Sequence, residues 1–241
     1  TQVGSSAASD VYKRQTDGKT YTVTVVSDSG NKYRFDGFGT SAVTLDLAEG
    51  GTYIFNYPSA HPLKFSTTAD GTHGGGSEYT TGVTHNSSTQ VTIVVAASAP
   101  TLYYYCGSHS GMGGAVNTNS TLGSSNFAGS VQSTVKANTT AGFSIVTYTG
   151  TGSNATVGHG LGVTPETFIL KGRNFGDHWR VYHQGVGTSL SDSNRKALKL
   201  NTADSYQTST SYWNDTSPTS TTVSLGTDQS INKNTGTFVM Y

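Results

Sequence analysis

The sequence is poor in cysteine, in charge and in long apolar runs, and each shortage excludes a class of protein. One Cys among 241 residues cannot form an internal disulfide, so the fold is not a disulfide scaffold. The 14 basic residues balance the 14 acidic ones, which argues against a nucleic-acid-binding arm or a basic patch for an anionic membrane. No apolar run approaches the roughly 18 residues of a membrane-spanning helix, and the N-terminus lacks the pattern of a signal peptide.

An apolar period of about 3.6 residues, the mark of an amphipathic helix, is also missing. The polarity comes from Gly, Ser, Thr and Asn, which populate turns and strands more than helices. Alternating or fully apolar segments, such as residues 21–26, 52–57 and 89–97, recur about every 10 to 15 residues with turn residues between them. That spacing is typical of a sandwich or a barrel, so we expect an all-β chain.

Residues 121–140 separate two regions of patterned strands. This segment has few large apolar side chains and many Ser, Thr, Asn and Gly residues, so we predict a linker with at most one short paired segment. The linker divides the chain into a first β domain at residues 16–120 and a second β domain at residues 141–241.

Both ends of the chain have the character of fragment ends. The DNA that would encode DVYKRQ, residues 10–15, resembles the transposon-end adapter of sequencing libraries. We therefore expect residues 1–15 to be a cloning or assembly scar in a metagenomic sequence, with a polar tail as the alternative. Tyr241 falls inside a predicted strand with no turn after it, and we expect the second domain to be truncated there.

The one Cys lies in the segment CGSHSGMGG, where His109 follows Cys106 by three residues and Met112 follows His109 by three. Thiolate, imidazole and thioether groups suit copper, and two His with one Cys and a long axial Met form the blue-copper arrangement. The glycines of the segment permit the tight turns that three ligands from one loop require. His61, after the predicted strand at residues 52–57, is the candidate for the second His.

This order of ligands resembles the cupredoxin family of type 1 copper proteins, which fold as a Greek-key β-sandwich. The resemblance covers about residues 20–120; the short loop is similar to the amicyanin type, and the aromatic run LYYYC resembles the strand that enters the plastocyanin site. The resemblance implies that His61, Cys106 and His109 bind one copper ion, with Met112 as the axial ligand. Copper would then cycle between Cu(I) and Cu(II).

One residue departs from the family pattern. Many cupredoxins place a polar residue after the upstream His, where it ties the two ligand loops together, whereas this chain has Pro62. Proline has no N–H and no side-chain donor, and hydrogen bonds around a metal site tune its potential. Ser59 and Ser66 are the candidate substitutes, and the departure bears on the potential and not on ligation.

Other interpretations of the same residues remain open. Cys106 could be an inert core residue on a relic fold without metal, or part of a Cys–His nucleophile pair, although no third, orienting residue supports the pair. His73 and His85 lie in a glycine-rich loop and are expected to be solvated. A second metal site there would need Asp70 and Glu78 to converge.

The second domain carries a different resemblance. The segments GFSIVTYTG at residues 142–150, VGHGLG at 157–162 and HWRVYH at 178–183 resemble repeated β domains of marine phage tail-fibre and related virion proteins. The resemblance implies a second β-sandwich with a spacer or host-recognition role and places His159 in a turn. A secreted, adhesin-like β domain is the alternative.

Taken together, we expect a non-enzymatic, copper-binding protein without catalytic residues, located in a virion appendage with a host surface receptor as partner. One alternative is a secreted or periplasmic electron carrier with a redox partner. Another is a structural or adhesion protein whose copper site has lapsed. A multicopper oxidase would need more clustered His than the seven of this chain. Fibre proteins are often trimers, but no trimer seam is recognisable, so the sequence leaves the oligomeric state open.

Overall fold

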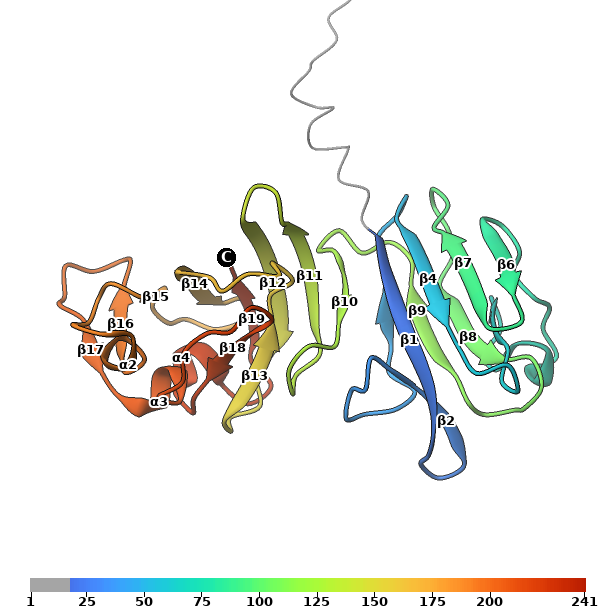
Figure 1. Cartoon of the computed structure of the whole chain (residues 1–241), viewed down its shortest axis with the longest axis horizontal. Coiled ribbons are helices and arrows are strands. Elements are labelled where there is room, and N and C mark those ends of the chain that lie inside the picture. The colour runs from blue at the N-terminus through green and yellow to red at the C-terminus, as the bar shows by residue number, and fades with distance from the viewer. Residues whose placement is uncertain (1–17) are drawn as a thin grey trace, which may run out of the picture. The chain divides into compact units, whose positions relative to one another are not determined.

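The computed structural model describes residues 18–241, and the predicted scar at residues 1–15 lies outside them. The described chain is all-β, as predicted, with strands throughout and helices limited to single turns (Figure 1). It divides into two compact units: the first extends to Tyr33 and resumes at Ala42–Ser124, and the second comprises Arg34–Ser41 and Ser125–Tyr241. Among residues 18–241, no helix has the length and apolar character needed to cross a bilayer.

The first unit is built from two mixed sheets. The five-stranded sheet has the order β2-β1-β4-β7-β6, with β1 parallel to β4, and the four-stranded sheet has the order β3-β9-β8-β5, with β3 parallel to β9. The strands are β1 (Gly18–Ser27), β2 (Asn31–Phe35), β3 (Leu45–Asp46), β4 (Thr52–Asn56), β5 (Leu63–Ser66), β6 (Val83–Ser87), β7 (Gln90–Val94), β8 (Leu102–Cys106) and β9 (Gly114–Asn117), with a 3-10 turn η1 (Gly71–Gly74) after β5.

Aromatic side chains fill the space between these two sheets. Phe55 of β4 meets Phe65 of β5 edge to face at 5.5 Å between ring centroids, and Tyr33 of β2 lies 6.2 Å from Tyr104 of β8. Strand β4 alternates buried and more exposed residues, as a strand with one face on a core must. The first unit is therefore a β-sandwich, and burial of each large apolar side chain stabilises it by about 1.5–3 kcal/mol.

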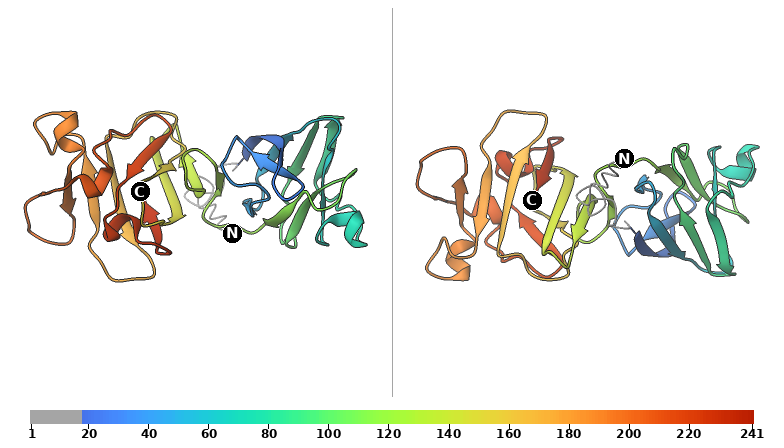
Figure 2. Two further views of the ribbon diagram at one scale, coloured as in Figure 1. Left: turned by 90° about the horizontal axis from the view of Figure 1, so that it is seen from below. Right: turned by 90° about the horizontal axis from the view of Figure 1, so that it is seen from above.

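The second unit contains an eight-stranded sheet, β10-β11-β12-β19-β14-β15-β16-β17, and a two-stranded sheet, β13-β18 (Figure 2). The strands are β10 (Ser124–Asn126), β11 (Ser133–Asn138), β12 (Phe143–Thr149), β13 (Ala155–Gly158), β14 (Thr167–Gly172), β15 (Arg180–His183), β16 (Lys196–Lys199), β17 (Gln207–Thr208), β18 (Thr222–Leu225) and β19 (Thr237–Met240). One-turn helices α2 (Leu190–Ser193), α3 (Thr210–Trp213) and α4 (Gln229–Asn232) lie between strands.

Trp213 anchors the core of the second unit. It is 1% exposed, packs edge to face on Phe168 and Tyr182, and donates its indole N–H to the Lys196 carbonyl at 2.8 Å. A buried indole needs such an acceptor. Strand β16, which holds that carbonyl, is thereby fixed to helix α3 across the core.

The predicted linker at residues 121–140 is wrong. Strands β10 and β11 both lie in it, and β11 pairs with β12 along its whole length. Val131 and Val135 pack against the second core, and the buried Ser133 donates its hydroxyl to the Gly158 carbonyl. Ser, Thr and Asn at most positions of these strands lowered the apolar content and hid them. The second unit therefore begins near residue 125 and not 141.

Candidate metal centre

The pairing of β5 with β8 brings the first two candidate ligands together. Cys106 is the last residue of β8 and pairs in register with Leu63, the first residue of β5. His61 lies two residues before Leu63, so the antiparallel ladder delivers its loop to the end of β8. The Gly107 amide donates to the Pro62 carbonyl at 2.8 Å, which extends the ladder beyond both strands.

The contact through the Pro62 carbonyl answers the question that the sequence raised about this residue. Proline lacks a donor, but its carbonyl accepts, so the two ligand loops are tied by backbone. Ser66 does not serve as a substitute because its hydroxyl donates to the Ser77 carbonyl and accepts from the Thr68 amide. Ser59 is exposed in the loop before His61.

His109 and Met112 come from the turn between β8 and β9. The turn folds back so tightly that a Cβ at Gly113 would lie 1.7 Å from the Tyr104 carbonyl oxygen. Only glycine permits that approach. The Gly111 amide at the tip donates to the Asp70 carboxylate at 2.8 Å, which holds the tip against the segment that follows β5.

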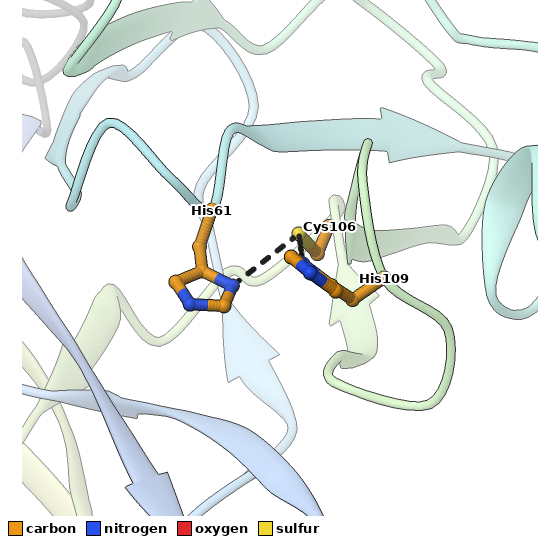
Figure 3. A group of neighbouring side chains, drawn as sticks. All are labelled: His61, Cys106 and His109. Carbon is orange, nitrogen blue, oxygen red and sulfur yellow. Dashed lines mark hydrogen bonds between the residues drawn. The ribbon is translucent and has the colours of Figure 1, made fainter.

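The structure brings three of the four predicted ligands into one cluster. The Cys106 Sγ atom lies 3.6 Å from Nδ1 of His109 and 3.9 Å from Nδ1 of His61, and all three ligand atoms lie within 4.8 Å of one another (Figure 3). Met112, the fourth predicted ligand, is fully buried in the same turn, and its carbonyl accepts from the Tyr33 amide at 3.0 Å.

These distances fit a metal ion. An ion at about 2.3 Å from a thiolate sulfur and about 2.0–2.1 Å from an imidazole nitrogen, at tetrahedral or trigonal angles, separates those two ligand atoms by about 3.6–3.8 Å. The observed sulfur-to-nitrogen distances of 3.6 and 3.9 Å bracket that interval. The donor set of one sulfur and two imidazole nitrogens is the softer kind that selects copper or zinc over magnesium or calcium.

Exposure is graded across the cluster. Cys106 is completely buried, His61 is half-buried and His109 is exposed. The buried thiol is shielded from oxidants and water, whereas the edge of the His109 ring faces solvent. A metal ion bound here would therefore have its thiolate side closed and its His109 side open.

Sequence reasoning missed the residues around the ligands. The Tyr33 hydroxyl donates to the His61 carbonyl at 2.7 Å; burial, and then a hydrogen bond with the Cys106 side chain, raises the pKa of this hydroxyl. His73, expected only as a solvated loop residue, is exposed but brings its Nε2 within 3.0 Å of the Cys106 carbonyl oxygen. Asp70 was considered only for a second metal site, yet it binds the Gly111 amide.

The convergence of Asp70 and Glu78 that a second metal site would need does not occur. Glu78 instead pairs with Lys64 and with His85, both at 2.6 Å, and these hydrogen bonds lower the pKa of the Glu78 carboxyl against the raising effect of its burial. Among the described residues, the cluster of His61, Cys106 and His109 is the one group of His, Cys, Asp and Glu side chains placed to hold a metal.

His159 of the second unit is buried and not merely placed in a turn. It is 2% exposed and lines a cavity of about 390 Å³. Its Nε2 donates to the Thr219 carbonyl and its Nδ1 accepts from the Leu161 amide, both at 3.2 Å. Desolvation lowers the pKa of His159, partly opposed by the bond to Thr219. Both ring nitrogens are thus used by backbone, which leaves none for a metal.

Comparison with known proteins gives a family for the C-terminal part. No curated protein and no solved structure matches the chain. A family profile described as a domain of unknown function, DUF7483, matches residues 115–241, which is more than half of the chain. All four candidate ligands precede the matched segment. On this match, the chain belongs to the DUF7483 family.

Proposed function

We propose that the first unit binds one copper ion through His61, Cys106 and His109, with the thioether of Met112 as a fourth ligand, and that the protein is not an enzyme. The observation that carries the proposal is the cluster itself, whose sulfur-to-nitrogen distances of 3.6 and 3.9 Å suit one ion. The resemblance of the sequence to cupredoxins supports copper over zinc, because an axial Met beside two His and one Cys is the blue-copper set.

Copper bound in this set supplies a one-electron couple between Cu(II) and Cu(I). The protein's own part is to keep the ligand positions constant between the two states. Cys106 is fixed by its place at the end of β8, and the β5–β8 ladder brings the loop of His61 beside it. The Gly111 tip is held by Asp70, so the turn that carries His109 and Met112 is restrained at its far end.

The test is to add Cu(II) to the purified protein and record absorption. An intense blue colour that bleaches on reduction is expected. Cys106→Ser should abolish the colour because the thiolate is lost, and Met112→Leu should keep it while shifting the potential. His85→Gln is the matched control, since this exposed His pairs with Glu78 away from the cluster. Absence of colour in the wild-type protein, with an unchanged melting temperature, would overturn the proposal.

The biological setting that we propose is a phage virion appendage, in which the second unit attaches or presents the copper unit to a host surface receptor. The support is the resemblance of residues 142–183 to tail-fibre domains. A secreted or periplasmic electron carrier is the second candidate, and the exposed edge of His109 favours it, since electrons need a short path to a partner. Neighbouring tail and capsid genes support the first setting, and respiratory neighbours the second.

A further inference from the structure

Strand β2 contacts both loops that carry the candidate ligands. The Tyr33 amide donates to the Met112 carbonyl at 3.0 Å, and the Tyr33 hydroxyl donates to the His61 carbonyl at 2.7 Å. The neighbouring Lys32 ammonium donates to the Gly111 carbonyl. Two adjacent residues of one strand therefore hold three carbonyl groups of the two ligand loops.

Tyr33 makes its contacts from inside the core. Its side chain is fully buried, and its ring lies beside that of Tyr104, 6.2 Å away between centroids. A hydrogen bond in such surroundings is costly to leave unmade, so the His61 carbonyl is held firmly in place.

The loops need such contacts because the sheet alone does not fix them. Neither His61 nor Met112 lies in a strand: the β5–β8 pairing ends with the bond from the Gly107 amide to the Pro62 carbonyl, so it brings the His61 loop near Cys106 but does not hold the His61 carbonyl. Their segments are also far apart in the sequence, and β2 is a third segment that contacts both. A site held in its binding geometry before the ligand arrives avoids the cost of ordering on binding.

We propose that Tyr33 is a positioning residue for the metal centre. Its hydroxyl fixes the His61 loop and its amide fixes the Met112 loop, so the ligand atoms are assembled before a metal ion enters. This inference rests on the copper site proposed above and adds a residue that acts through the ligands and does not itself bind the ion.

The test is Tyr33→Phe in the full chain, which keeps the ring and removes the hydroxyl. Cu(II) is titrated against a chelator of known affinity, and the variant is expected to bind roughly tenfold more weakly, equivalent to about 1.4 kcal/mol. The sulfur-to-copper absorption band should also shift, because the hydroxyl holds the loop of His61, whose Nδ1 lies 3.9 Å from the Cys106 sulfur. A loss of fold stability alone would not move that band.

Tyr53→Phe is the matched control. Tyr53 is equally buried in the same unit, and its hydroxyl bonds Ser124 and the Ala48 amide, neither of which belongs to a ligand loop. This variant should lose stability while keeping the copper affinity and the absorption band of the wild-type protein.

The outcomes separate the two proposals. If the wild-type protein takes up no copper, the proposed function is overturned. If the wild-type protein binds copper and Tyr33→Phe keeps its affinity and band, the positioning role alone is overturned. Hydrogen exchange on the copper-free wild-type protein covers the case in which the variant does not fold. The Tyr33 amide should exchange as slowly as the core amides of β4, and rapid exchange would overturn the positioning role.

Discussion

The turn that carries His109 and Met112 should tolerate an added methyl group at one glycine and not at another. A Cβ at Gly113 would lie 1.7 Å from the Tyr104 carbonyl oxygen and 2.7 Å from its carbonyl carbon. Those are backbone atoms that cannot swing aside. A Cβ at Gly107 would meet Lys64 Cδ and Cε at 3.1 Å, which belong to a flexible side chain. Neither glycine has a left-handed φ, so the comparison isolates the effect of space.

The cost of Gly113→Ala follows from the β8–β9 ladder. To reach an acceptable contact, the two backbones must separate by more than about 1 Å, which exceeds the range of a hydrogen bond. The pairing of Tyr104 with Gly114 is then lost. Overpacking costs about 1–3 kcal/mol and each lost backbone hydrogen bond about 1 kcal/mol, so we expect a loss of about 3 kcal/mol. Gly107→Ala should cost less than about 1 kcal/mol.

Thermal unfolding measures this difference. For a domain of roughly 100 residues, about 3 kcal/mol lowers the melting temperature by about 12–24 °C. Trp179 and Trp213, the two Trp residues of the chain, both belong to the second unit, so Trp emission follows that unit while circular dichroism follows both. Gly113→Ala should shift a dichroism transition and leave the Trp transition in place. A Gly113→Ala melting curve within a few degrees of that of Gly107→Ala would refute the steric argument.

Two further predictions concern the second unit. The pKa of His159 is lowered in the folded protein. Below the usual histidine pKa of about 6.5, the unfolded chain therefore binds more protons than the folded protein does. The contribution of His159 to the stability of this unit is therefore fully present above that pH and falls as the pH drops below it. Urea unfolding followed by Trp emission should show the free energy of unfolding falling with pH, and His159→Gln should flatten this dependence. Trp213→Ala should lower the free energy of unfolding by about 3–5 kcal/mol, measured by urea denaturation followed by circular dichroism; a loss below about 1 kcal/mol would show that the packing on Phe168 and Tyr182 matters little.

The sequence was sufficient for the fold class and for the pair of Cys106 and His109 because both depend on local patterns, whereas His61, 45 positions from Cys106, was assigned from the order of ligands that resembles cupredoxins. Alternation and turn residues predict strands, and a Cys at a strand end with His109 in the following turn predicts a site. The residues around the ligands were not predictable in this way. Tyr33 contacts His61 across 28 positions of sequence, and its segment, KYRF, is an ordinary strand pattern whose depth in the core only the packed sheets reveal.

The linker prediction also failed because contacts between residues far apart in the sequence do not appear in local composition. The hydroxyl of the buried Ser133 is satisfied by one hydrogen bond to the Gly158 carbonyl. A buried strand residue of this kind is polar, so it adds nothing to the apolar pattern from which strands are predicted. Composition detects strands that are stabilised by their own side chains. It does not detect those, such as β10 and β11, that depend on pairing with a neighbour and on a few valines such as Val131 and Val135.

The candidate chemistry and the family domain occupy different parts of the chain. Each histidine of the second unit has a local hydrogen-bond partner: His159 binds Thr219 and Leu161, His178 lies against Asn201, and His183 accepts from the Gly185 amide. Their ring nitrogens do not converge, and the described residues of this unit hold no Cys. The matched segment begins at residue 115, after the last candidate ligand. A domain of this family that lacks the preceding unit should therefore fold as a β domain without the copper centre, and copper uptake by residues 115–241 alone would contradict the assignment of the metal to the first unit.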